Sequence, residues 1–128
     1  MELQQMSNSE FEIMQIIWQS GNEITVGVLL NKLCGLGKSW KSSTVVTFLS
    51  RLVDKGMLTA IKDGRTNLYM AAISEEELRE YETQTFIKKI YDGNAKELVA
   101  SLLKQESLTP EDIDELRIFW QKGRDLSE

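Results

Sequence analysis

The sequence changes its hydrophobic period abruptly after Gly56. Two short segments rich in strand-forming residues, Met57 to Lys62 and Thr66 to Ala71, flank the pair Asp63-Gly64. A pair of this type between two such segments is the strongest short-range signal for a β-hairpin. We therefore expect a hairpin with its tip at residues 62–65. The rest of the chain has helical periodicity, so the predicted fold class is mainly α with a small β-hairpin.

Three helices are expected before this hairpin and three after it. The first covers about residues 9–18, and either Ser9 with Glu12 or Ser7 with Glu10 fits a capping box at its start. The second follows Thr25, a good N-cap residue. The third runs from about residue 42 to 55 and the later three from about 75 to 91, from 95 to 105 and from 110 onward.

The third predicted helix has two different faces. Its apolar face consists of Val45, Leu49 and Leu52, joined by three neighbouring apolar residues, Val46, Phe48 and Val53. Its other face carries Thr44, Thr47 and Arg51 at spacings of three and four residues. The order of three helices and a hairpin is that of a winged helix-turn-helix, in which the third helix enters the major groove of DNA.

Short polar and long cationic side chains suit contacts with base edges and phosphates. The predicted DNA-contacting residues are Lys38, Lys41, Ser42, Ser43, Thr44, Thr47, Arg51, Lys62 and Arg65, and Lys55 is a further cation available to phosphate. A solvated helix face is the simpler alternative for the third helix. Arg51 could also pair with Asp54 at i+3 instead of facing DNA.

The net charge of -5 argues at first against a nucleic-acid partner. The charge is segregated, however. Residues 1–73 carry seven basic and six acidic residues, whereas residues 74–128 carry eight and fourteen. No acidic residue occurs between Ile24 and Val53, the stretch that contains the third helix and its approach. The first part is therefore the one expected to meet DNA.

The absence of histidine and the presence of only one cysteine exclude several classes of site. Without histidine the commonest general base and zinc ligand is missing, and one cysteine forms neither a cluster nor an internal disulfide. We expect no enzyme activity, no cofactor and no metal site. Cys34 is interpreted as a small buried hydrophobic residue. With no membrane-spanning segment or signal peptide in the sequence, a cytoplasmic location is expected.

The last three predicted helices carry apolar side chains without an obvious core of their own. We predict that residues 74–128 form a helical dimerisation domain, and that residues 1–73 form the winged helix-turn-helix domain. Association with the same region of a second chain is the simplest way to cover the apolar set. That set is Leu98, Val99, Leu102, Leu103, Ile113, Leu116, Phe119 and Trp120.

Along nearly its whole length the chain resembles the penicillinase and methicillin-resistance repressors. The ordered set of matching residues carries the resemblance, whereas no single motif is specific. It consists of Glu10-Phe11-Glu12-Ile13-Met14, Ile17-Trp18, Trp40, Thr44-Val45, Leu49, Arg51-Leu52, Lys55-Gly56, Gly64-Arg65, Tyr69, Phe86, Tyr91-Asp92-Gly93, Asp112-Ile113 and Glu115-Leu116.

The resemblance implies a homodimeric winged-helix repressor that binds a palindromic operator. It also implies relief of repression by a membrane sensor with a metalloprotease domain, which responds to β-lactams and leads to cleavage of the repressor. The family's cut site falls at Ser101-Leu102, where the family has Asn-Phe. The alternative from another class is a winged-helix module that docks a protein partner and does not bind DNA.

Overall fold

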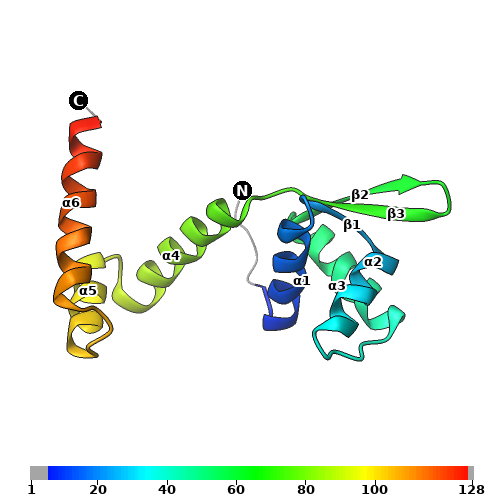
Figure 1. Cartoon of the computed structure of the whole chain (residues 1–128), viewed down its shortest axis with the longest axis horizontal. Helices are drawn as coiled ribbons and strands as arrows, with labels where there is room; N and C mark the ends of the chain where they lie inside the picture. The colour runs from blue at the N-terminus through cyan, green and yellow to red at the C-terminus, as the bar shows by residue number, and fades with distance from the viewer. Residues whose placement is uncertain (1–5, 127–128) are drawn as a thin grey trace. The chain divides into compact units, whose positions relative to one another are not determined.

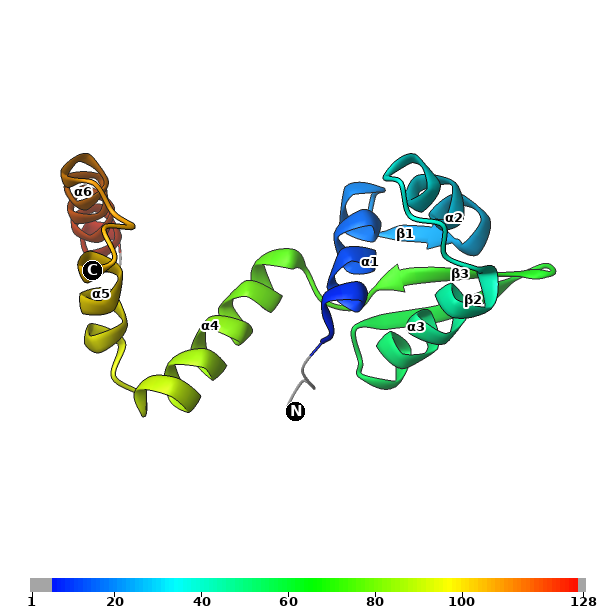
Figure 2. The same ribbon diagram turned by 90° about the horizontal axis from the view of Figure 1, so that it is seen from below.

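The computed structural model of the chain describes residues 6–126 and divides into two compact units, Met1–Glu80 and Tyr81–Glu128. Within the described residues it contains six helices and one small three-stranded sheet (Figures 1 and 2). The predicted fold class, mainly α with a β-hairpin wing, is confirmed. None of the described helices is long and apolar enough to cross a membrane.

Helix α1 (Asn8–Gln19) has its N-cap at Ser7, not at Ser9. The Ser7 backbone is extended, with φ -73° and ψ 164°, which suits an N-cap residue. The Glu10 amide donates to the Ser7 hydroxyl at 3.2 Å, and the Ser7 amide donates to the Glu10 carboxylate at 3.0 Å. Of the two capping boxes considered, the register of Ser7 with Glu10 is thus the correct one.

The next two helices match the sequence prediction closely. Helix α2 (Val26–Gly35) is capped by the hydroxyl of Thr25, which accepts from the Val28 amide. Helix α3 (Ser42–Asp54) is followed by Lys55 as its C-cap residue. Gly56 follows with a φ of +79°, a conformation in which glycine avoids the strain of a side chain.

The hairpin joins a third strand that the sequence analysis did not predict. Strands β2 (Leu58–Asp63) and β3 (Thr66–Ala71) pair antiparallel, and β1 (Glu23–Thr25) adds to the other edge of β3. Asp63 pairs with Thr66, so Gly64 and Arg65 form the loop, one residue later than Asp63-Gly64. Gly64 has a φ of +66°, as expected for the first residue of a tight hairpin loop.

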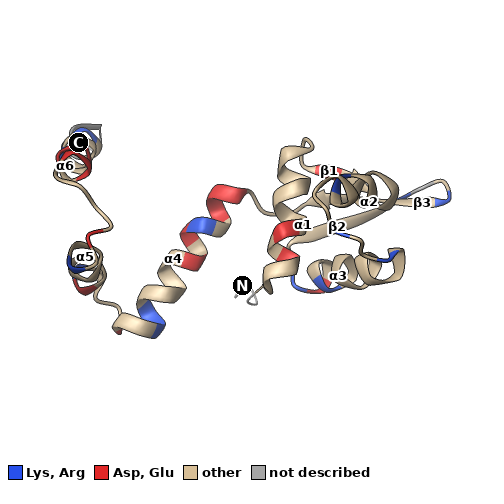
Figure 3. Cartoon of the chain, turned by 60° about the horizontal axis from the view of Figure 1, so that its bottom comes forward, with Lys and Arg blue, Asp and Glu red and all other residues tan. Residues whose placement is uncertain are grey.

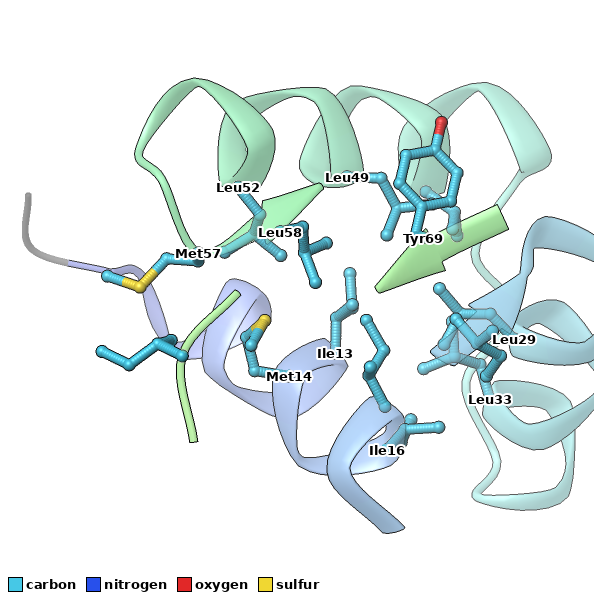
Figure 4. Close-up of a cluster of buried hydrophobic side chains, with 14 of the residues drawn as sticks. Ile13, Met14, Ile16, Leu29, Leu33, Leu49, Leu52, Met57, Leu58 and Tyr69 are labelled. Atoms are coloured by element: carbon cyan, nitrogen blue, oxygen red, sulfur yellow. The ribbon is translucent and has the colours of Figure 1, made fainter. Parts of the chain in front are cut away.

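The core of the first unit lies between the three helices and the sheet (Figure 4). Its buried side chains come from α1, α2, α3 and the strands, and include Ile13, Met14, Ile17, Leu29, Leu33, Val45, Leu49, Leu52, Met57, Leu58 and Tyr69. The indole of Trp18 donates to the Ile73 carbonyl at 2.9 Å, which holds the chain after β3 against α1. Leu78, in α4, belongs to the same cluster.

Cys34 is exposed, so its interpretation as a buried residue was wrong. The buried stripe of α2 consists of Leu29 and Leu33, which are four residues apart. Because consecutive residues of a helix point about 100° apart, the residue after Leu33 turns away from this stripe.

Helices α4 (Glu75–Tyr91), α5 (Ala95–Lys104) and α6 (Pro110–Leu126) follow the hairpin, as predicted. Ser74 and Glu77 form the expected capping box of α4, and Thr109 forms one with Asp112 at the start of α6. The division between the two compact units falls inside α4, after Glu80. The assignment of residues 1–73 and 74–128 to separate functions stays a prediction.

Candidate nucleic-acid interface

Helix α3 has one face in the core and the opposite face in solvent. Val45, Leu49 and Leu52 are completely buried, as their spacing predicted. The polar side chains on the other side are exposed, and they are Ser42, Ser43, Thr44, Thr47, Ser50 and Arg51. The helix is therefore fixed by its apolar face and offers short polar groups and one guanidinium outward.

Arg51 lies beside an aromatic ring. Its guanidinium carbon is 5.9 Å from the centre of the Phe48 ring, within the range of a cation–π contact. Phe48 packs in turn on Trp40, with 5.6 Å between the ring centres. Among the described residues, no ion pair joins Arg51 to Asp54, which was the alternative considered for this side chain. The exposed guanidinium remains available to a ligand.

Thr47 uses its hydroxyl hydrogen within the helix. The hydroxyl donates to the Ser43 carbonyl at 2.9 Å, the usual contact of a threonine with the preceding turn. The side chain is exposed. It can therefore offer a ligand its oxygen lone pairs and its methyl group, but not its O–H.

Val46 was expected on the apolar face of α3, and the structure contradicts this. Its side chain is 38% exposed and is not among the residues packed against the core. Its neighbours along the helix surface are exposed Ser42, Ser43 and Ser50 and buried Leu49, so it lies at the border of the two faces. Spacing in the sequence therefore assigns it to either face, and only the packing of the folded unit decides between them.

Two lysines precede α3. Lys41 occupies the N-cap position and its side chain is exposed. The Lys38 ammonium lies 3.1 Å from a carboxylate oxygen of Glu12 and 5.5 Å from the centre of the Trp40 ring. Both groups of this ion pair are about one third exposed or more, so water and salt weaken it. The Lys38 ammonium can therefore leave Glu12 and pair with another anion.

Lys55 is not a free cation, contrary to expectation. Its ammonium lies 2.9 Å from Oε1 of Glu10, and the two side chains are only 17% and 3% exposed. Burial would raise the pKa of Glu10, but hydrogen bonds from Lys55 and Ser7 lower it below its ordinary value of 4.5. Lys55 therefore neutralises a buried carboxylate and anchors the end of α3 to the start of α1.

The wing carries two further cations at its tip (Figure 3). Lys62 is the last residue but one of β2 and Arg65 lies in the loop, and both are exposed. No acidic residue occurs from α2 to Val53. The structure thus places every predicted DNA-contacting residue in the first unit, on α3, its approach or the wing.

The apolar residues of α5 and α6 are largely uncovered. Phe119 is 76% exposed and Trp120 62%, while Leu116, Val99, Leu103 and Ile113 are exposed to lesser degrees. Leu98 and Leu102 are half-buried. Ser101, which precedes Leu102 in α5, is also half-buried.

Known proteins resemble this chain over most of its length. A family profile described as penicillinase repressor matches residues 6–122. The penicillinase repressor of Bacillus licheniformis is 31% identical over 115 residues, which are 90% of this chain and 88% of the relative. The methicillin resistance regulatory protein MecI of Staphylococcus aureus (strain N315) is 30% identical over 122 residues, 92% of this chain and 94% of the relative.

A solved structure resembles part of this chain. The solution structure of the DNA binding domain of the repressor BlaI has a TM-score of 0.52 and 32% sequence identity. The similarity covers 59% of this chain and 90% of that one.

Proposed function

The chain belongs to the penicillinase repressor family, a family of transcriptional repressors and not of enzymes, and on this premise we propose that it represses transcription by binding an operator as a homodimer. In this proposal residues 1–73 bind the duplex and residues 74–128 hold two chains together. The exposed polar face of α3, which is fixed from behind by buried Val45, Leu49 and Leu52, carries the proposal.

The residues on α3 and the cations around it have separate roles in this proposal. Ser42, Ser43, Thr44, Thr47 and Arg51 lie along α3, where a helix in the major groove meets base edges. Cations before the helix and on the wing contact phosphates on either side, and these are Lys38, Lys41, Lys62 and Arg65.

Homodimerisation is proposed from the exposed apolar side chains of α5 and α6. Monomeric proteins rarely expose contiguous apolar patches of large area. A second copy would cover Leu98, Val99, Leu102, Leu103, Ile113, Leu116, Phe119 and Trp120 through a two-fold interface. Two recognition helices then require a palindromic operator with half-sites about 34–36 Å apart, or a multiple of that distance.

Relief of repression is proposed to act on the same helices. Ser101 and Leu102, at the position of the family's cut site, lie inside α5. Cleavage there, by a protease linked to a membrane sensor of β-lactams, would divide the dimerisation residues between two fragments. The repressor would then lose half of its phosphate contacts without any change in α3.

The direct test is selection of duplexes from a random pool by the full chain, followed by titration of the selected duplex. We expect Arg51→Ala to weaken binding by ~1–3 kcal/mol if this residue reads a base. Lys96→Ala, which removes an exposed cation of α5, is the matched control and should leave affinity unchanged. Failure to enrich any sequence would contradict the proposal and favour a protein-docking module.

The proposed dimerisation is tested separately from DNA binding, by measuring the mass of the chain in solution. Sedimentation equilibrium of the full chain should give twice the monomer mass, and Phe119→Ser with Leu116→Ser should shift it toward the monomer. The same double variant should bind the selected duplex more weakly although α3 is intact. A monomeric wild-type chain at micromolar concentration would refute this part of the proposal alone.

A further inference from the structure

Two methyl-bearing side chains lie next to each other in the sequence on the exposed part of α3. Val46 is 38% exposed and does not pack on the core. Thr47 is exposed, and its hydroxyl hydrogen is bonded to the Ser43 carbonyl at 2.9 Å. Val46 therefore presents part of its apolar surface to solvent, and Thr47 uses its hydroxyl hydrogen within the helix.

The major groove presents one apolar group, the 5-methyl of thymine, beside its donors and acceptors. The guanine edge offers only acceptors, N7 and O6, whereas adenine N6 and cytosine N4 carry donors from which the Thr47 oxygen can still accept. Thr47 cannot donate to the guanine acceptors while its hydrogen is held by Ser43. Its methyl group, like those of Val46, suits thymine. We propose that α3 recognises thymine through the methyl groups of Val46 and Thr47, an inference that rests on the proposed DNA-binding function.

The contribution of such a contact is set by the apolar surface that it covers. Removing a methyl-sized group from water contributes about 0.8 kcal/mol, which corresponds to about fourfold in affinity. The recognised thymines should therefore show a modest and additive preference. A contact of this size changes the relative affinity for operators that differ by a thymine. Most of the total affinity comes from Arg51 and the surrounding cations.

The experiment replaces single thymines of the selected duplex by deoxyuridine, which lacks only the 5-methyl group. Affinities of the full chain are measured by fluorescence anisotropy at fixed salt. We expect at least one thymine per half-site whose replacement weakens the wild-type chain about fourfold. Because the comparison is a ratio for one protein, an effect of a substitution on folding cancels.

Matched variants assign the effect to the two residues. Val46→Ala and Thr47→Ser each remove methyl groups and should abolish the discrimination between thymine and uracil at one position. Val46→Thr keeps one methyl of a similar shape, and Thr47→Val keeps the methyl without the hydroxyl. Both should preserve the discrimination.

Three outcomes overturn the inference in distinguishable ways. A pool without any enriched sequence refutes the proposed function, and this inference with it. An enriched operator whose thymines can all be replaced by deoxyuridine without loss refutes thymine recognition alone. A loss for Thr47→Val that Thr47→Ser does not share shows that Thr47 acts through its oxygen, and removes it from the proposed contact.

Discussion

Replacing Lys55 by methionine should destabilise the fold more than replacing its partner Glu10 by glutamine. Methionine keeps most of the apolar stem of lysine and removes the ammonium. Glu10 then retains the Ser7 amide, at 3.0 Å from Oε1, while Oε2 has no hydrogen-bond partner among the described residues. A carboxylate whose side chain is only 3% exposed is left without its cation.

The magnitude follows from the exposure of the two groups. Removing one partner of a buried ion pair costs about 3–5 kcal/mol. We expect about 3 kcal/mol for Lys55→Met, because Glu10 also lies in the first turn of α1, where the helix dipole favours a negative charge. Glu10→Gln should cost about 1–2 kcal/mol, since the amide oxygen still accepts and the Lys55 side chain, 17% exposed, keeps some contact with water.

Urea denaturation of both single variants and the double variant measures these costs and their coupling. The wild-type pKa of Glu10 is lowered, so its contribution is complete above about pH 4.5 and is lost as the pH falls through the folded-state pKa. In Lys55→Met burial acts without the cation, so the pKa of Glu10 should rise instead. The deficit of the variant should therefore be largest at neutral pH and shrink in acid.

Lys62→Met is the matched control, since Lys62 is an exposed lysine of the same unit. It should change the free energy of unfolding by less than about 0.5 kcal/mol. The reasoning is refuted if Glu10→Gln costs more than Lys55→Met. A deficit of Lys55→Met that does not change between pH 7 and pH 4 refutes it as well, because Glu10 would then not be the buried charge responsible.

Three further predictions concern the wing, the first unit and the interface. Gly64→Ala, at a φ of +66°, should destabilise the hairpin by about 1 kcal/mol, which thermal denaturation measures, and an unchanged midpoint would contradict this. Trp18→Phe removes the bond to the Ile73 carbonyl and should lower the free energy of unfolding by about 1–2 kcal/mol in urea. Lys41→Ala should reduce the slope of log K against log salt by about 1, and an unchanged slope would remove Lys41 from the phosphate contacts.

The helices could be predicted from the sequence because their signals are local. The cap residues Thr25, Ser74 and Thr109 were each recognised within four positions of the groups that they bind. The buried set of α3 followed from spacing alone. Where the sequence offered two capping registers for α1, the observed one also brings Glu10 to Lys55, a partner 45 residues away that local signals do not include.

Strand β1 and the partners of the lysines could not be predicted in this way. Three residues, Glu23–Thr25, are too short for a periodic signal, and they form a strand only because β3 has a free edge beside them. The pairing of Lys38 and Lys55 likewise depends on the packing of α1 beside α3. Val46 was misassigned because an apolar residue at the border of two helix faces belongs to either one by spacing.

Helix α1 supplies the acidic partners of two lysines that flank α3. Its two acids Glu10 and Glu12 each meet a lysine that flanks α3, Lys55 after the helix and Lys38 before it. The pairs differ, because one is nearly buried and fixes the end of α3, whereas the other is open to water and salt. An almost equal number of acids and bases in residues 1–73 is thus compatible with a cationic face. Positive charge at the proposed interface therefore comes from exposed cations outside these two pairs, which are Arg51 on α3, Lys41 before it, and Lys62 and Arg65 on the wing.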